Sequence, residues 1–172
     1  MKLPINFNDW IENNRHLLKP PVGNQVVYKD TEFIIMVVGG PNTRKDYHVD
    51  IAEEFFYQLE GDMILKIVES REFKDIPIRE GDIFLLPPNI PHSPQRFTDT
   101  VGLVIERQRK LGELDGFRWY CDSCEILLYE KFIQLNDIVT QLSPLFENYW
   151  SEESNRTCRN CGEIQQPPEK HS

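Results

Sequence analysis

Six short segments, rich in β-branched and aromatic residues, follow one another along the middle of this chain without helical segments between them. Gly, Pro and Asp punctuate them, and they read QVVYKD, EFIIMVVGG, EFFYQLEGD, MILKIVES, DIFLLPPN and VGLVIERQR. Short runs of this composition predict strands. Several such strands separated by turns predict an antiparallel sandwich or barrel, so we expect a mostly β protein.

A helix is predicted at the N-terminal end. Residues 6–18 carry apolar side chains at helical spacing, with Asn6 or Asn8 as the cap. The KPP at residues 19–21 ends this helix, because proline is not accommodated in a helix interior.

The C-terminal third changes in composition. Residues 125–135 predict one more strand, at an edge, and residues 136–150 predict a helix. Pro144 suits a first helical turn, so a restart is expected at Ser143–Pro144. The polar tail after Cys161 is expected to fray.

The length of 172 residues suits one domain with a small appendage. We expect a barrel domain over residues 1–120 and a C-terminal extension over 121–172. The 19 basic and 28 acidic residues give a net charge of −9, which disfavours nucleic acid or an anionic membrane as a partner. We find neither a signal peptide nor a membrane-length apolar run, so a cytoplasmic protein is expected.

The four cysteines form two C-x-x-C pairs, Cys121 with Cys124 and Cys158 with Cys161. This spacing is strong evidence for a tetrahedral thiolate metal site in a reducing compartment, rather than for disulfides. A structural site is favoured over a redox site, because it lies outside the barrel motifs.

Two further motifs predict a second metal site. H-x5-E-x6-G runs from His48 through Glu54 to Gly61, and G-x5-P-x4-H runs from Gly81 to His92. Together they resemble the signature motifs of the cupin superfamily, a jelly-roll-like β-barrel with a metal inside it. His48, Glu54 and His92 would then form a 2-His-1-carboxylate set, typical of non-haem Fe(II) oxygenases. The alternative is that they are ordinary strand residues satisfied by hydrogen bonds.

The sequence departs from the usual cupin pattern at two positions. Asp50 stands where a second histidine is customary, and Arg96 stands where asparagine often follows the last histidine. Side chains two and four residues apart share a strand face, so Arg44 should lie on the face of His48, and Arg96 on that of His92. Two arginines near a metal favour a carboxylate substrate, although surface salt bridges are the alternative for each.

Glu106 is a third kind of candidate. It shares a strand face with Gly102 and Val104, so it enters the barrel if they do. A buried carboxylate beside a metal is a candidate proton shuttle. The alternative is a strand-end glutamate paired with Arg107 or Arg109.

The chain as a whole resembles the family of 3-hydroxyanthranilate 3,4-dioxygenases from about residue 5 to 162. The resemblance includes the cysteine tail of bacterial and fungal members, and it rests on LLKPPVGN, VVGGPNTRKDYH, EEFFYQLEGD, GDIFLLPPNIPHSPQR, VIERQR and RWYC. It implies Fe(II) ligands at His48, Glu54 and His92, and a rubredoxin-like site at the cysteines, for which iron or zinc would serve.

The resemblance also implies the other site residues. These are the substrate-carboxylate arginines, the acid/base glutamate, a residue near substrate and dioxygen, and one that supports the ligands: Arg44 and Arg96, Glu106, Asn24, and Asp46. Glu54 would also approach the substrate. The implied reaction opens the ring of 3-hydroxyanthranilate between C3 and C4 with both atoms of O2. Its product, 2-amino-3-carboxymuconate semialdehyde, closes to quinolinate, a precursor of NAD. A homodimer is expected from the family.

Other functions remain open on the residues alone. A cupin dioxygenase for another hydroxylated aromatic acid, or a zinc isomerase, would use the same ligand set. A non-catalytic metal cupin could sense a small acid or bind a partner through the cysteine knuckle. A zinc-ribbon nucleic-acid module is the weakest alternative, given the net charge of −9.

Overall fold

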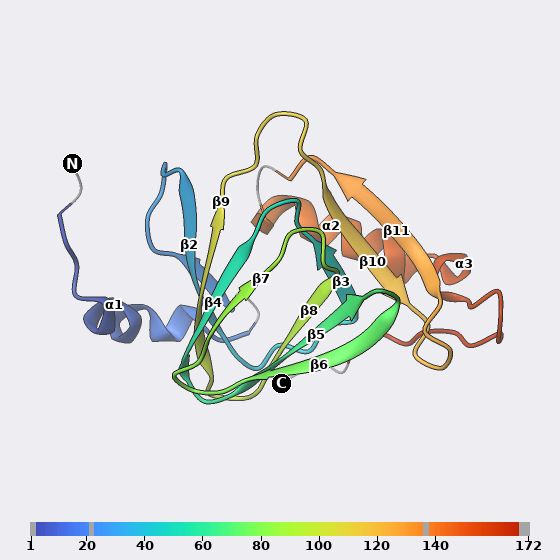
Figure 1. Cartoon of the computed structure of the whole chain (residues 1–172), viewed down its shortest axis with the longest axis horizontal. Helices are drawn as coiled ribbons and strands as arrows, with labels where there is room; N and C mark the ends of the chain where they lie inside the picture. The colour runs from blue at the N-terminus through green and yellow to red at the C-terminus, as the bar shows by residue number, and fades with distance from the viewer. Residues whose placement is uncertain (1–2, 21–22, 136–137, 169–172) are drawn as a thin grey trace.

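The computed structural model describes residues 3–20, 23–135 and 138–168, and its core is two antiparallel β-sheets facing each other (Figure 1). The strands are β1 Asn24–Val26, β2 Phe33–Gly39, β3 Asp46–Val49, β4 Glu54–Glu60, β5 Met63–Glu69, β6 Glu72–Ile78, β7 Ile83–Leu86, β8 His92–Arg96, β9 Val101–Arg107, β10 Asp115–Tyr120 and β11 Leu127–Ile133. In the described part of the chain, no helix is both long and apolar enough to span a membrane.

The first sheet has the order β1-β2-β9-β4-β7, and the second has the order β11-β10-β3-β8-β5-β6. All strand pairs are antiparallel. The predicted mostly β barrel with a helix towards each end is confirmed. All six predicted segments contain strands. β11 is the strand predicted over residues 125–135, and β3 and β8 carry the histidines to which strand parity was applied, so β6 and β10 are the strands that no prediction covered. Between the sheets, Phe56, Met63 and Leu65 are each at most 1% exposed.

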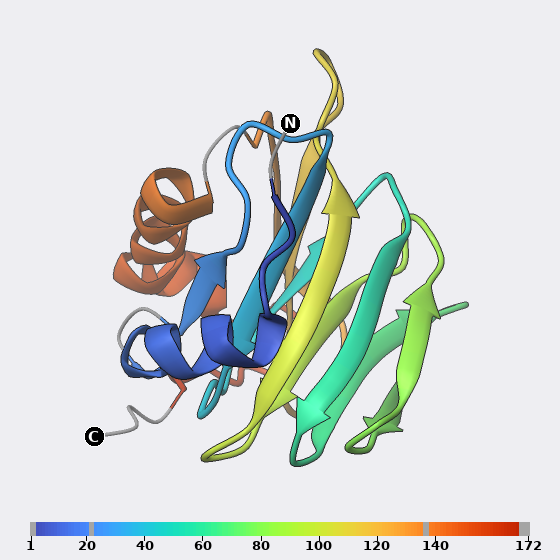
Figure 2. The same ribbon diagram turned by 90° about the vertical axis from the view of Figure 1, so that its left-hand side faces the viewer.

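The N-terminal helix α1 spans Phe7–Asn14 and continues as a short 3-10 helix over Arg15–Leu17. Asn6 is the cap, and its side chain accepts a hydrogen bond from the Asp9 backbone N–H at 3.2 Å. Figure 2 shows α1 lying across the outer face of the five-stranded sheet. Its apolar side packs there on a small cluster that includes Val37 and Val101.

The C-terminal extension continues the second sheet. As predicted, its strand is at an edge, because β11 pairs with β10 alone. The expected restart at Ser143–Pro144 is wrong, since α2 runs unbroken over Ile138–Ser151. Proline inside a helix removes one backbone hydrogen bond. Contacts of the helix with Trp119 and Tyr129 on the sheet offset that loss.

The expectation of a frayed tail is wrong for the residues that directly follow Cys161. Gln165 is 2% exposed, and its side chain accepts a hydrogen bond from the Tyr149 hydroxyl at 2.6 Å. The same amide donates to the Tyr120 carbonyl at 2.8 Å. A polar residue buried with both ends satisfied is stable, so the tail is fixed to α2 and β10. A short helix α3, Glu153–Arg156, leads into it.

Candidate active site

The inward faces of β4, β8 and β9 build the centre of the barrel in layers. Alternate side chains point inward on each strand. β4 and β9 are in register, so their inward residues form opposed pairs: Glu54 with Glu106, Phe56 with Val104, and Gln58 with Gly102. His92, Pro94 and Arg96 of β8 are the corresponding residues on the facing sheet.

The predicted metal ligands come together at one end of this interior. One ligand atom from each of His48, Glu54 and His92 lies within 4.8 Å of the others. β3 and β8 pair His48 directly with His92, and the two rings are 5.1 Å apart. The strands therefore bring together three donor groups of the kind that bind iron, zinc or manganese.

The Glu54 carboxylate fits a metal better than it fits its protein neighbours. Its Oε2 lies 2.8 Å from His92 Nε2. The two atoms lack hydrogen-bond geometry, and Oε2 has no other hydrogen-bond partner among the described residues. A buried carboxylate oxygen without a hydrogen bond is costly. A cation between the three donors would satisfy it, so the residues present fit the metal.

Neighbouring groups hold both imidazoles in place. His92 Nδ1 lies 3.0 Å from the Ile90 carbonyl, and His48 Nε2 lies 2.8 Å from Asp115 Oδ1. The Phe117 ring stacks on the His48 ring at a centroid distance of 5.2 Å. Such contacts fix the orientation of ligating histidines.

Glu106 lines the pocket, and its partner is Arg109 rather than Arg107. Arg109 Nη1 donates to Glu106 Oε1 at 2.7 Å, and the same guanidinium contacts Asp50 at 3.0 Å and Asp115 at 2.7 Å. Burial, together with nearby Glu54, raises the pKa of Glu106 to about 7, although Arg109 opposes the shift. A carboxyl group with this pKa is suited to proton transfer near neutral pH.

The two predicted arginines line the same pocket but differ in their partners. Arg44 is paired with Asp46, through Nε to Oδ1 at 3.1 Å and through a second short contact. Arg96 has no carboxylate within ion-pair distance among the described residues, and its Nη1 donates to the neutral amide oxygen of Gln58 at 3.0 Å. Arg96 is 3% exposed, and burial lowers its pKa to about 10. A buried guanidinium without a counter-ion is suited to an anionic ligand.

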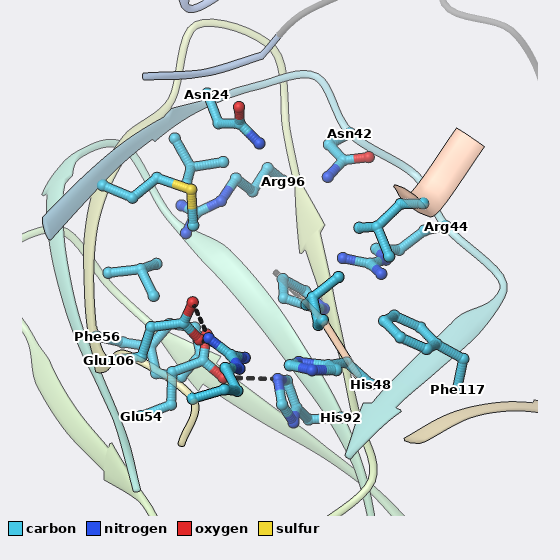
Figure 3. Close-up of a pocket in the computed structure, with 17 residues that line it drawn as sticks. Asn24, Asn42, Arg44, His48, Glu54, Phe56, His92, Arg96, Glu106 and Phe117 are labelled. Atoms are coloured by element: carbon cyan, nitrogen blue, oxygen red, sulfur yellow. Dashed lines mark hydrogen bonds and ion pairs between the residues drawn. The ribbon is translucent and has the colours of Figure 1, made fainter. Parts of the chain in front are cut away.

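Figure 3 shows both arginines at one end of the pocket, with Asn24 and Asn42, and the histidines and glutamates at the other. The cavity volume is about 130 Å³, which suits a small ligand rather than a polymer. Asn24, the first residue of β1, is therefore in the pocket as expected. The apolar wall residues, which sequence reasoning did not assign, are Met36, Val38, Phe56, Pro94, Val104, Phe117, Leu135 and Leu142.

The four cysteines meet outside the barrel. Their sulfur atoms all lie within 4.8 Å of one another, and none is in a disulfide. Cys121 and Cys161 sulfurs are 3.5 Å apart, as are those of Cys124 and Cys158. A tetrahedral thiolate site with metal–sulfur bonds of about 2.3 Å has edges of about 3.8 Å, so this cluster has nearly the right size. N–H groups of Cys161 and Asn160 directed at Cys158 lower the pKa of its thiol to about 6.

A family model described as 3-hydroxyanthranilic acid dioxygenase matches residues 1–150. The chain belongs to this family. The 3-hydroxyanthranilate 3,4-dioxygenase of Jannaschia sp. is 53% identical over 96% of this chain and 94% of its own. The enzyme of the same name from Xanthomonas campestris is 51% identical over 98% of this chain and 96% of its own.

The similarity to the 3-hydroxyanthranilate 3,4-dioxygenases extends beyond the barrel. The alignments with these relatives cover nearly the whole chain, so they include most of the C-terminal extension. Among solved structures, a cupin-2 domain protein from Shewanella frigidimarina covers 60% of this chain and 94% of its own, with 19% identity and a TM-score of 0.46.

Proposed function

We propose that this chain is an Fe(II)-dependent 3-hydroxyanthranilate 3,4-dioxygenase. The observation that supports this most is the arrangement of one small pocket. A set of metal-type donors lies at one end of it, and the buried, unpaired guanidinium of Arg96 lies at the other. A small aromatic acid with metal-binding groups on its ring would satisfy both ends.

In this proposal His48, Glu54 and His92 hold Fe(II). The bound ion supplies the electron-transfer chemistry through which dioxygen reacts with the aromatic ring. The protein orients the two histidine ligands, through Asp115 for His48 and through the Ile90 carbonyl for His92.

The arginines orient the substrate. Arg96 and Arg44 bind the carboxylate of 3-hydroxyanthranilate, which directs the ortho amino and hydroxyl groups towards the metal ligands. Asn24 and Glu54 border the same volume. The apolar walls exclude bulk water from the ring, and Phe56 and Phe117 bound it on two sides.

Glu106 transfers protons during the reaction. Its carboxylate accepts a proton from the substrate hydroxyl or amino group, and it returns a proton as the product forms. The overall reaction adds both atoms of O2 and opens the ring between C3 and C4, giving 2-amino-3-carboxymuconate semialdehyde. This product closes to quinolinate, which places the enzyme in the kynurenine route to NAD.

The cysteine cluster is proposed as a structural site for iron or zinc. Residues 1–120 would form the catalytic barrel and 121–172 the extension that this site stabilises. Pairing of β10 with β11, and the contacts of Gln165 with Tyr120 and Tyr149, support a bracing role. Four cysteines outside disulfides support a reducing, cytoplasmic location.

A homodimer is also part of the proposal. The outer face of the five-stranded sheet is open on the β4 and β7 side in Figure 2, beyond α1. Large apolar residues of β7 are exposed there, Ile83 at 66% and Leu85 at 53%, and Phe33 at the start of β2 is 52% exposed. Exposed apolar patches of this kind mark interaction surfaces. Neither nucleic acid nor a membrane is proposed as a partner.

Oxygen uptake with Fe(II)-loaded protein and 3-hydroxyanthranilate tests the function. We expect one O2 consumed per substrate, with the ring-opened product formed in step, and loss of both in His48→Ala. Uptake only with another hydroxylated aromatic acid would assign a different cupin dioxygenase. Binding of the acid without any oxygen uptake, with iron verified in the barrel, would favour the sensor and contradict the dioxygenase.

A further inference from the structure

The layer of the barrel farthest from the metal ligands consists of Arg96, Gln58 and Gly102. Gln58 and Gly102 oppose each other on β4 and β9. Both are buried, and neither lines the pocket, whereas Arg96 does. They therefore lie behind the guanidinium and can influence a ligand only through it.

Gln58 is held so that its amide oxygen faces Arg96. Its Nε2 donates to the Glu60 carbonyl at 3.1 Å, and its Oε1 accepts from Arg96 Nη1 at 3.0 Å. Its backbone is fixed as well, through hydrogen bonds with Asp82 and Gly81. Gln58 is 1% exposed, so its amide is shielded from water and depends on these protein partners.

Gln58 is also neutral, and this matters for the charge of the pocket. A carboxylate at this position would pair with Arg96 and satisfy it inside the protein. The amide orients the guanidinium without neutralising it. The contrast with Arg44, which Asp46 already neutralises, leaves Arg96 as the free positive charge of the site.

Gly102 provides the space for this arrangement. It lies in a regular part of β9, outside the set of glycines with positive φ, so backbone conformation does not require glycine. A Cβ atom at position 102 would lie 2.4 Å from Arg96 Nη1 and 2.8 Å from Gln58 Oε1. Such distances are far inside van der Waals contact, so any larger residue would displace the guanidinium.

We propose that Gln58 and Gly102 are positioning residues that set the direction and the free charge of Arg96, and thereby determine the preference for a carboxylate-bearing substrate. This inference rests on the proposed function for the identity of the substrate. Both residues lie outside the pocket. If their role were purely structural, they would not affect the specificity for the substrate.

The test is anaerobic calorimetry on the metal-loaded protein with two ligands. 3-Hydroxyanthranilate and 2-aminophenol share the ortho amino and hydroxyl groups, and only the first has a carboxylate. The ratio of their dissociation constants measures the carboxylate preference. We expect Gln58→Glu to reduce this preference by about tenfold or more, because the new carboxylate occupies Arg96. Gly102→Ala should reduce it by about threefold or more, because the guanidinium is displaced.

Two controls separate positioning from general damage. Gln108→Glu adds the same charge at an exposed position just after β9 and should leave the preference unchanged. Thermal unfolding of each variant establishes that it is folded. If Gln58→Glu does not fold, Gly102→Ala tests the inference alone.

The outcomes are distinct. Equal weakening of both ligands in the folded variants, or an unchanged preference, would overturn the positioning role. Wild-type protein that shows the preference but consumes no oxygen in air would contradict the dioxygenase and leave the positioning role intact. Wild-type turnover with variants that keep the preference would contradict the positioning role alone.

Discussion

Glu54 and Glu106 lie directly opposite each other on β4 and β9, and their carboxylates contact different partners: the His92 imidazole for Glu54 and the Arg109 guanidinium for Glu106. Two adjacent glutamates thus have separate environments. Glu54 faces the cluster of metal donors, while Glu106 is held at the side of the pocket with a raised pKa. Such divergence between neighbouring carboxyls is typical of acid/base sites.

Replacing Glu106 by Gln should lower kcat by about 10²- to 10⁴-fold, because the proton acceptor is removed. Only the ionised carboxylate accepts a proton, so wild-type kcat/KM should fall as the pH falls through the pKa of Glu106. A bound cation would lower that pKa, so this acid limb should lie at or below about pH 7. Steady-state pH profiles measure it. Glu113→Gln, at a surface pair with Arg107, should keep the wild-type profile.

Arg96→Met should raise the dissociation constant of 3-hydroxyanthranilate by about 10- to 100-fold, since a charge-assisted hydrogen bond contributes roughly 1.5–3 kcal/mol. The loss of stability should be moderate, because the neutral amide oxygen of Gln58, and no carboxylate, loses its partner. Arg44→Met should do the reverse: it leaves Asp46, which is 5% exposed, without its cation. We therefore expect a larger loss of stability and a smaller loss of affinity. Calorimetry and urea unfolding of both variants measure this. A larger loss of affinity in Arg44→Met than in Arg96→Met would contradict this division of roles between the two arginines.

Glu54→Gln should abolish metal binding in the barrel and leave the cysteine site occupied. The two donor sets do not share residues, so metal analysis should give one equivalent in place of two. Far-ultraviolet circular dichroism should be unchanged. Retention of both equivalents would show that Glu54 is not a ligand.

Cys124→Ser should have the opposite effect on the two metal sites. The barrel metal should remain, while the thiolate site is lost and the melting temperature falls, because binding at such a site contributes folding free energy. Activity per barrel metal, measured well below the new melting temperature, should stay near the wild-type value. A complete loss of activity in a folded variant with barrel iron would point to a redox role for the cysteines.

Arg109→Met should cost about 3–5 kcal/mol of stability, because it leaves buried carboxylates without their shared cation. The side chains of Arg109, Asp50 and Asp115 are each at most 4% exposed. Arg107→Met is the matched control two residues away. Its ion pair with Glu113 is more exposed, so the change should lower the free energy of unfolding by less than about 1 kcal/mol. Urea unfolding of the two variants measures the difference.

The centre of the site was predictable because its residues follow the spacing of two motifs and the two-residue repeat of a strand. The motif spacing placed His48, Glu54 and His92 together, and strand parity placed Arg96 and Glu106 on inward faces, as found. The roles of these residues remain predictions. What the spacing could not provide was the choice of partners, because Arg109 reaches residues from three separate segments.

The elements missed by the strand pattern have physical reasons. β6 contains charges and Pro77, which an edge strand tolerates since one side of its backbone needs no partner. β10 begins with Asp115 and Gly116, which usually signal turns; here Asp115 is buried because Arg109 and His48 satisfy it. The order of the tail at Gln165 depends on hydrogen bonds to Tyr120 and Tyr149, which are distant in sequence.

The pairing of β4 with β9 restricts where residues can be inserted into the chain or deleted from it. Deleting one residue between Glu54 and Gln58 would turn every later side chain of β4 to the opposite face. The metal donor and the support of Arg96 would then no longer share the barrel interior. Only the tip of the loop between β9 and β10 has no such restriction, because Leu111 there is 100% exposed and does not line the pocket, whereas Arg109 in the same loop does. Insertions and deletions compatible with activity should therefore concentrate at the loop tip around Leu111, while β4, β8 and β9 keep a constant length.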